Sequence, residues 1–378
     1  MKIVRTIQKD VEDRLFKGKV IIIYGARQVG KTTLATAIME KHASSQKTLY
    51  LNCDDRDVRS ELTNKTSTEL KNTLSPYTLV VIDEAQRVEN IGLTLKLLVD
   101  TYPEIQIIAT GSSSFDLSNK ISEPLTGRKF EFHLFPFSLQ ELSQEYQKPF
   151  EIQRILESRM LFGAYPEVVE AGADAKNRLR EIVQSYLYKD VLEYQNIRHS
   201  EVLDKLLQAL ALQIGTEVSY VELAGLIGVN KITVENYVRI LEQAFIIFRL
   251  PPLSRNLRNE LKKMRKIYFY DLGVRNALIN NFNPLELRQD VGALWENYMI
   301  SERIKFNRNN DKSPNMYFWR TLQKQEIDYV EDEGGVLSGF EFKWKKDTYK
   351  RPKVFLEAYS GSDISLVNRE SFHKFVGI

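Results

Sequence analysis

Runs of branched apolar residues alternate with an amphipathic stretch in the first third of the chain. The apolar runs are "KVIIIY" (19–24), "LVVI" (79–82) and "IQIIAT" (105–110). Continuous apolar runs of this length are typical of strands that are buried on both faces of a parallel sheet. The stretch "KTTLATAIMEKH" (31–42) has apolar residues at helical spacing. We therefore predict an α/β fold with a parallel sheet for this region.

Helical periodicity dominates the middle of the chain. Residues 175–195 carry an amphipathic stripe. The stretches "YVELAGLIG" (220–228) and "KITVENYVRILEQA" (231–244) predict two short helices that meet at a glycine, and the apolar run "FIIFRL" (245–250) follows them. This order is typical of a winged helix-turn-helix.

The final third returns to a mixed pattern. It predicts, in order, an amphipathic helix (290–306), three strands (315–321, 326–333 and 339–344), a helix (about 350–360) and a strand (363–368). In the third of these strands, Glu341 and Lys343 share one face because strand side chains repeat every two residues.

Composition narrows the class of protein. The 378 residues allow two or three domains, and 43% hydrophobic residues supply ample core material. A net charge of +3 does not indicate a nucleic-acid binder, so any basic surface must be local. The single cysteine, Cys53, and four histidines exclude an internal disulfide and a Cys/His zinc site. We find no signal core and no membrane span, so we expect a cytoplasmic protein without a membrane partner.

A phosphate-binding loop lies between the first strand and the first helix. The stretch "GARQVGKTT" matches G-x-x-x-x-G-K-[ST] without a gap, and its strand-loop-helix context is the required one. Glycines let backbone N–H groups face phosphate oxygens, and the helix N-terminus favours anions. Lys31 would then bridge the β- and γ-phosphates and Thr32 would hold Mg²⁺. The predicted nucleotide contacts are Gly25, Ala26, Arg27, Gln28, Val29, Gly30, Lys31, Thr32 and Thr33.

An acidic pair follows the second buried run. Asp83 and Glu84 end "LVVIDE", which is where an open α/β sheet places its chemistry. Asp83 is the candidate for holding Mg²⁺ through water, and Glu84 is the candidate for orienting the attacking water.

Two further residues are candidates for catalysis. Ser112, with Ser113 as the alternative, follows the third strand, where a polar residue can sense the γ-phosphate; a helix-capping turn is an equal alternative. Arg128 precedes the strand-like run "KFEFHLF". It could act as an arginine finger on a neighbouring subunit's nucleotide, which requires a homo-oligomer, or it could be a surface arginine in a turn.

The chain resembles the prokaryotic AAA-type ATPases that are related to archaeal ATPases and to origin-recognition and STAND-type NTPases. The resemblance is carried by "GARQVGKTTL", "LVVIDEAQ", "IIATGSSS" and "LTGR". It implies ATP as the nucleotide, with Mg²⁺. Gly163 and Pro166 loosely resemble the Gly-x-Pro motif of STAND-type lids, with one residue more between them, and a structural corner is the alternative.

The second helix of the predicted winged helix-turn-helix offers a set of polar residues. Its candidate DNA contacts are Lys231, Thr233, Asn236 and Arg239. Such residues could touch phosphates or bases, and the basic stretch 250–266 adds local charge. Docking of a protein is the open alternative.

The final third resembles the domain of unassigned function that accompanies such ATPases and is itself similar to PD-(D/E)XK nucleases. The matching residues are Glu296, Asp328, Glu341 and Lys343. By this resemblance, the carboxylates would bind a second Mg²⁺ or Mn²⁺ that activates water, and Lys343 would position the water. A fold that is kept while its activity is lost remains the alternative.

These predictions combine into four regions. They are an AAA-type core (1–148), a helical lid (149–204), a winged helix-turn-helix (205–262) and a nuclease-like domain (263–378). We expect ATP hydrolysis that drives or gates action on DNA, with metal-dependent cutting by the last region as a further hypothesis. The rival interpretation is an ATP-controlled switch or scaffold that binds a protein partner through an inert nuclease fold.

Overall fold

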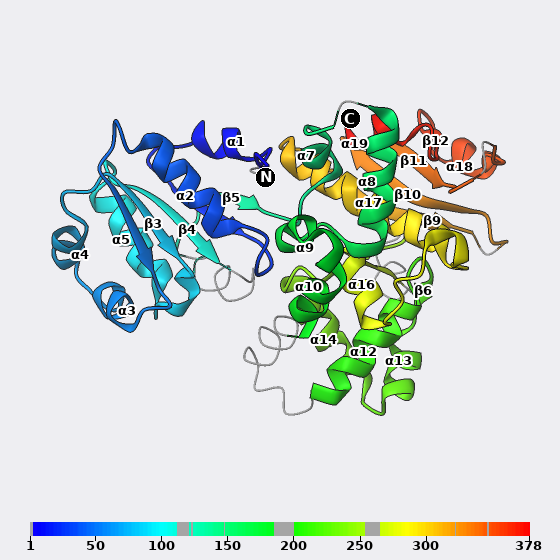
Figure 1. Ribbon diagram of the computed structural model, residues 1–378, viewed down its shortest axis with the longest axis horizontal. Coiled ribbons are helices and arrows are strands. Elements are labelled where there is room, and N and C mark those ends of the chain that lie inside the picture. Colours follow the sequence, from blue (N-terminus) through cyan, green and yellow to red (C-terminus); the bar gives the residue numbers. More distant parts are fainter. Residues whose placement is uncertain are drawn as a thin grey trace. The chain divides into compact units, whose positions relative to one another are not determined.

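A computed structural model describes residues 3–111, 121, 124–146, 148–184, 200–253, 265–321, 323–345 and 348–378. The chain forms two compact units (Figure 1). The first unit comprises Lys2–Phe135 with Gln243–Phe245, and the second comprises Pro136–Glu242 with Ile246–Ile378. Each unit has its own sheets, so each is described separately.

The first unit is built on a five-stranded parallel sheet with the order β2-β3-β4-β1-β5. Its strands are β1 (Val20–Tyr24), β2 (Thr48–Asn52), β3 (Leu79–Asp83), β4 (Gln106–Gly111) and β5 (Lys129–His133). The three central strands are buried along their whole length, as their continuous apolar runs predict. The α/β fold with a parallel sheet is therefore confirmed.

Helices complete the first unit. They are α1 (Gln8–Glu12), α2 (Lys31–His42), α3 (Arg56–Leu62), α4 (Ser67–Leu74) and α5 (Ile91–Thr101). Helix α2 begins directly after the predicted phosphate loop and packs on β3 and β4 (Figure 1). The carboxyl ends of β1, β3 and β4 consequently meet at one edge of the sheet, beside the start of α2.

The second unit begins with helices and a small antiparallel sheet. The helices are α7 (Leu139–Ser143), α8 (Pro149–Phe162), α9 (Pro166–Glu170), α10 (Ala175–Ile182), α12 (Ser200–Leu212), α13 (Tyr220–Ile227) and α14 (Lys231–Gln243). The sheet has the order β6-β8-β7, with strands β6 (Glu217–Val218), β7 (Ile247–Leu250) and β8 (Arg265–Phe269). Residues 185–199 and 254–264, where parts of the predicted lid and of the basic stretch fall, lie outside the described residues.

The rest of the second unit contains a four-stranded sheet with the order β12-β11-β10-β9. Its elements are α16 (Leu272–Leu278), α17 (Val291–Asn309), β9 (Asn315–Arg320), β10 (Glu326–Glu333), β11 (Val336–Phe342), α18 (Lys353–Ala358), β12 (Asp363–Val367) and α19 (Phe372–Val376). Strands β9, β10 and β11 are antiparallel, whereas β11 and β12 are parallel. The predicted order of helix, three strands, helix and strand is thus present.

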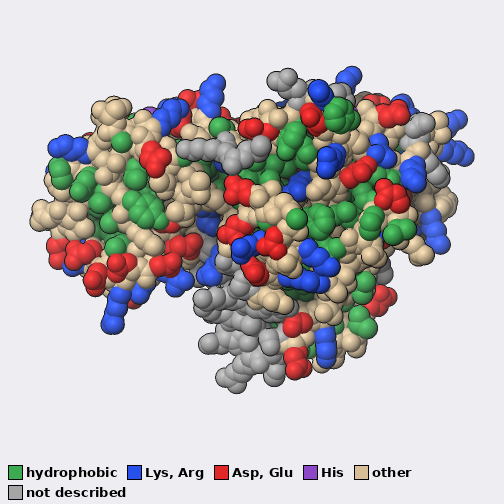
Figure 2. All heavy atoms as spheres, in the orientation of Figure 1, with side chains coloured by type: hydrophobic (Ala, Val, Ile, Leu, Met, Phe, Trp, Pro, Cys, Tyr) green, Lys and Arg blue, Asp and Glu red, His purple; other side chains and the backbone are tan. Residues whose placement is uncertain are grey.

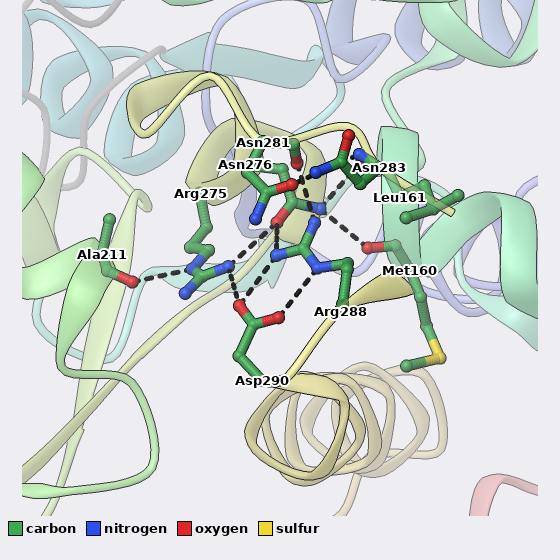
Figure 3. Close-up of polar contacts among 9 residues, drawn as sticks. All are labelled: Met160, Leu161, Ala211, Arg275, Asn276, Asn281, Asn283, Arg288 and Asp290. Atoms are coloured by element: carbon green, nitrogen blue, oxygen red, sulfur yellow. Dashed lines mark hydrogen bonds and ion pairs between the residues drawn. The ribbon is translucent and has the colours of Figure 1, made fainter. Parts of the chain in front are cut away.

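A buried polar network joins distant segments of the second unit (Figure 3). Asp290 accepts hydrogen bonds from Arg275 (2.7 Å) and Arg288 (2.8 Å). Asn276 donates to the carbonyl oxygens of Met160 and Leu161, both at 2.9 Å. Oδ1 of Asn276 also accepts from Arg288 at 3.1 Å, so the network ties the end of α8 to the segment that precedes α17.

Among the residues that the structure describes, no helix is both long enough and apolar enough to cross a membrane.

Candidate nucleotide-binding site

The loop between β1 and α2 has the backbone that a phosphate cradle requires. Gly30 has φ +94° and Gln28 has φ 60°, and both values lie in the left-handed region. A Cβ atom at Gly25 would lie only 2.2 Å from the carbonyl oxygen of Leu134, so no larger residue fits there without a shift of the backbone. The loop therefore turns tightly and presents the start of α2 to the edge of the sheet.

Lys31 is held inside this loop. Its ammonium donates to the carbonyl oxygens of Gly25 (3.0 Å) and Ala26 (2.9 Å), and the residue is buried. Neutral carbonyls are weaker partners for an ammonium than phosphate oxygens are. This position suits a lysine that exchanges loop carbonyls for the phosphates of a nucleotide.

Asp83, at the end of β3, collects three hydroxyl donors. Its Oδ2 accepts from the hydroxyls of Thr32 and Tyr50, both at 2.7 Å, and its Oδ1 accepts from the hydroxyl of Thr110. Burial and the hydrogen bond to Asp83 raise the pKa of Tyr50, so this hydroxyl stays a donor. The contact between Thr32 and Asp83 joins the two side chains that the sequence assigns to Mg²⁺, and both are ligands of the hard oxygen type that Mg²⁺ prefers. The residues therefore fit the ion.

Glu84 sits in a strained position next to Asp83. It has φ 51°, which is unusual for a residue with a side chain, and its backbone N–H donates to the Thr110 hydroxyl at 3.3 Å. Its carboxylate accepts from the amide of Gln86 at 2.5 Å. Strained residues of this kind are common at functional sites, and here the hydrogen bond from Gln86 orients the acidic side chain.

Sequence reasoning missed Thr110, Tyr50 and Arg5. The parallel register that pairs Ile82 with Ala109 brings Thr110 beside Asp83, and this register is not readable from the chain alone. A hydroxyl residue at the end of the third apolar run was the one available signal for Thr110.

Arg5 holds the phosphate loop from outside it. Its guanidinium donates to the carbonyl oxygens of Val29 (2.8 Å) and Phe135 (2.5 Å), and the residue is buried. Its distance in sequence from the loop gave no signal of this role.

The two remaining catalytic candidates have different outcomes. Ser112, like its alternative Ser113, lies outside the described residues. Arg128 lies just before β5, and its Nε is 2.5 Å from Oδ1 of Asp100, with both side chains 40% exposed. Within its own chain, Arg128 is thus engaged in a surface ion pair.

The residues predicted for DNA contact lie on α14 and carry local partners. Lys231 forms an ion pair with Glu235 (3.2 Å), and Arg239 donates to Asn236 (3.4 Å). Thr233 donates to Asn230 at the start of the helix (3.1 Å). On the visible face of the second unit, basic and acidic side chains are interspersed (Figure 2).

Gly163 lies in a closely packed corner between α8 and α9, and Pro166 begins α9. Gly163 ends α8 with φ +74°, and a Cβ there would lie 1.9 Å from the carboxylate of Asp271. That carboxylate accepts from the backbone N–H of Ala164 at 2.7 Å. For Gly163, these contacts favour the structural alternative.

The four nuclease-like candidates come from three neighbouring elements. Glu296 lies on α17, Asp328 on β10 and Glu341 on β11, and Lys343 follows β11 directly. Lys343 is 2.6 Å from Glu341, and Asp328 accepts from the backbone N–H of Phe342 at 2.9 Å. The pairing of β9 and β10 is irregular between Ile327 and Val330, beside Asp328.

Burial dominates the electrostatics of these carboxylates. Together with the charge of Asp328, it raises the pKa of Glu296 to about 7. Burial also raises the pKa of Asp328, and burial together with Asp328 raises that of Glu341. The carboxylates therefore influence one another, as groups that share one site do.

A lysine that the sequence analysis did not single out lies in this cluster. Nζ of Lys266 is 2.6 Å from Glu326 and 3.1 Å from Glu296. In the part of the chain that the structure describes, no group of three or more His, Cys, Asp or Glu side chains is arranged to hold a metal ion. With an ammonium group among the carboxylates, the residues do not fit the metal that the nuclease resemblance implies.

Comparison with known families agrees with the geometry of the first unit. Residues 17–143 match an AAA domain. Residues 153–285 match a domain of unknown function (DUF8612), and residues 291–373 match another domain of unknown function (DUF4143). The residues that form the glycine loop, α2 and β3 therefore lie within a segment that is similar to an AAA-type P-loop module.

Two uncharacterized proteins are similar to this chain over most of its length. The chain is 26% identical to an uncharacterized protein of Methanocaldococcus jannaschii over 352 residues, which is 86% of this chain and 75% of the relative. It is 25% identical to an uncharacterized protein of Mycobacterium tuberculosis over 335 residues, which is 87% of this chain and 71% of the relative.

Solved structures show remote similarity. AMPPCP-bound DnaA from Aquifex aeolicus is 19% identical, with a TM-score of 0.28, and the match covers 62% of this chain and 86% of that one. Cdc6p from Pyrobaculum aerophilum is 13% identical, with a TM-score of 0.31, and the match covers 75% of this chain and 94% of that one.

Proposed function

We propose that the first unit binds ATP with Mg²⁺ and hydrolyses it. The observation that carries the proposal is the contact between Thr32 and Asp83 at the foot of a glycine loop that holds Lys31. The loop amides and Lys31 would bind the phosphates, and Thr32 and Asp83 would hold the ion. Mg²⁺ supplies charge stabilisation when it is bound.

Glu84 is the residue that we assign to the attacking water. It follows Asp83 and has its carboxylate oriented by Gln86. As a carboxylate, it can accept a hydrogen bond from water and align it with the γ-phosphate. Thr110 contacts both Asp83 and the backbone of Glu84, so it couples the metal-binding residue to the water-binding one.

The test separates binding from hydrolysis. Glu84→Gln should bind a fluorescent ATP analogue as the wild type does and should release phosphate at least about 100-fold more slowly. Exposed Glu89→Gln, a few residues further along the chain, is the matched control and should leave both values unchanged. Hydrolysis that survives in Glu84→Gln would contradict the assignment of this residue.

We further propose that the nucleotide state gates binding of DNA by the second unit. The support is the order of α13, α14, β7 and β8, which is that of a winged helix-turn-helix, and the exposure of Lys231, Asn236 and Arg239. DNA affinity that falls steeply with salt, and that differs between ATP-bound and nucleotide-free protein, is the expected result. Asn236→Ala with Arg239→Ala should weaken it, whereas the same changes at exposed Glu201 and Glu222 should not.

A second candidate function is an ATP-controlled switch that binds a protein partner. It is favoured by the exposed apolar side chains of Val221, Leu226 and Ile232 on α13 and α14, at 66%, 68% and 68% exposure. Apolar side chains at this position suit a protein surface better than a phosphate backbone. Absence of salt-dependent DNA binding, together with a partner captured by the wild type and lost in Leu226→Ser, would establish this function in place of DNA binding.

A further inference from the structure

We propose that Lys266 is the permanent cation of the carboxylate cluster in the second unit, and that this cluster therefore takes up no Mg²⁺ or Mn²⁺. The nuclease resemblance implies a metal at Glu296, Asp328 and Glu341. The structure instead assigns the positive charge there to a side chain of the chain itself.

Lys266 is fixed within the protein. It lies on β8, the central strand of its sheet, where it pairs with Glu217 of β6 on one side and Leu250 of β7 on the other. Only 1% of the residue is exposed, and its Nζ lies 5.5 Å from the centre of the Phe318 ring. A strand that is paired on both edges cannot swing its backbone away, so the ammonium stays with the cluster.

The ammonium bridges two elements. It lies 3.1 Å from Oε1 of Glu296 on α17 and 2.6 Å from Oε1 of Glu326 on β10. The hydroxyl of Tyr268, two residues further along β8, donates to the same Oε1 of Glu296 at 2.5 Å. This oxygen of Glu296 therefore already has two donors, and a metal ion would have to displace both.

The charges of the cluster reinforce this arrangement. Burial alone would lower the pKa of Lys266, but Glu296, Asp328 and Glu326 outweigh it and raise that pKa, so the side chain stays protonated. A dication that took oxygens from Glu296 and Glu326 would have to approach this ammonium. Two cations at such short range repel strongly where water is excluded.

Glu326 extends the constellation beyond the nuclease pattern. It lies two residues before Asp328 on β10, and its charge helps to raise the pKa of Asp328. Its second oxygen is 3.8 Å from Arg320, which also pairs with Glu217 at 3.5 Å. The ion pairs of the cluster therefore connect the small sheet that contains β8 to the sheet that contains β10.

The decisive measurement is binding of Mn²⁺ to the full, nucleotide-free chain, followed by electron paramagnetic resonance of the free ion. The buffer is kept well above the pKa of Glu296, so that its carboxylate is ionised. Wild type and Asp328→Asn should bind the same amount of Mn²⁺, because the cluster itself binds none. Any Mn²⁺ that both proteins bind lies at another site. One equivalent that the wild type binds and Asp328→Asn loses would overturn the proposal.

Two lysine variants test the reason for this behaviour. Lys266→Met should gain one equivalent of bound Mn²⁺, which a further Asp328→Asn change removes, and Mn²⁺ at ten times its Kd should raise its Tm by about 3 °C. Lys343→Met is the matched control, since it removes the other lysine of the cluster and keeps Lys266; it should gain no site. A folded Lys266→Met protein that binds no additional Mn²⁺ would also overturn the proposal. If Lys266→Met does not fold, the comparison of wild type with Asp328→Asn still decides the question.

Discussion

Asp83 and Glu296 are both carboxylates in otherwise well-packed surroundings, but they differ in the partners that surround them. Asp83 receives hydrogen bonds from three neutral hydroxyls, those of Thr32, Tyr50 and Thr110. Glu296 receives one from a hydroxyl and forms an ion pair with Lys266. Neutral donors orient a carboxylate and leave its negative charge uncompensated, so a cation can still bind. An ammonium group compensates that charge, so the electrostatic attraction for a metal ion is lost.

We expect the largest effect on the ATPase rate when the uncompensated charge of Asp83 is removed. Asp83→Asn keeps the size and an acceptor oxygen but loses the charge that attracts Mg²⁺. We expect phosphate release to fall by roughly 10²–10³-fold. Asp54→Asn, at an exposed aspartate after β2, is the control and should keep the wild-type rate. A rate in Asp83→Asn within a factor of two or three of wild type would mean that Asp83 does not hold the ion.

The two buried lysines give the second test. Lys266→Met leaves Glu296 and Glu326 without their cation, and we expect a loss of about 3 kcal/mol in the free energy of unfolding. Lys31→Met takes a hydrogen-bond donor from the carbonyl oxygens of Gly25 and Ala26, which are neutral groups, so its loss should be about 1 kcal/mol. Its ATPase activity should nevertheless disappear. Thermal unfolding of both variants measures the difference, and equal losses would show that the two lysines do not differ in structural role.

A third carboxylate, that of Asp290, forms ion pairs in a part of the molecule to which we assign no catalytic role. Burial acts to raise the pKa of Asp290, but hydrogen bonds from Arg288 and the charge of Arg275 outweigh it and lower the pKa to about 2. Because its pKa is lowered, the Asp290 carboxylate contributes its full stabilisation at pH values above 3.8, the ordinary pKa of aspartate. This contribution is lost as the pH falls through about 2.

We therefore expect Asp290→Asn to cost about 2 kcal/mol near neutral pH, with the difference from wild type shrinking below the ordinary pKa of aspartate. Urea unfolding at a series of pH values measures this trend. Exposed Glu286→Gln, in the same segment, is the control and should unfold like the wild type. A cost that does not change with pH would show that the Asn side chain disturbs packing and that charge is not the cause.

The smallest effect on stability is expected at the surface pair of Arg128 and Asp100. Both side chains are 40% exposed, and such a pair contributes less than about 1 kcal/mol. Arg128→Ala and Asp100→Asn should therefore unfold alike. If Arg128 acts on the nucleotide of a neighbouring subunit, only Arg128→Ala should lose ATPase activity, and the wild-type rate per molecule should rise with protein concentration.

Local pattern was sufficient to predict much of the molecule. The apolar runs at 19–24, 79–82 and 105–110 became the three central strands of a parallel sheet, because a strand buried on both faces must be apolar throughout. The glycine loop and the helix that follows it were predictable because phosphate binding imposes a short, contiguous pattern. The roles of Ser112 and Arg128 stay predictions.

Tertiary structure alone decided which partners each charged group has. Thr110 reaches Asp83 through the register of two parallel strands, and Lys266 reaches Glu296 and Glu326 through the contact of a strand, a helix and a second sheet. Periodicity along a chain reports which face a residue is on, but it does not report which distant residue faces it. The sequence by itself therefore determined the P-loop module and the candidate acids. The fold determined that hydroxyls surround one carboxylate and that a buried lysine pairs with the other, because compensation of charge depends on distances in space.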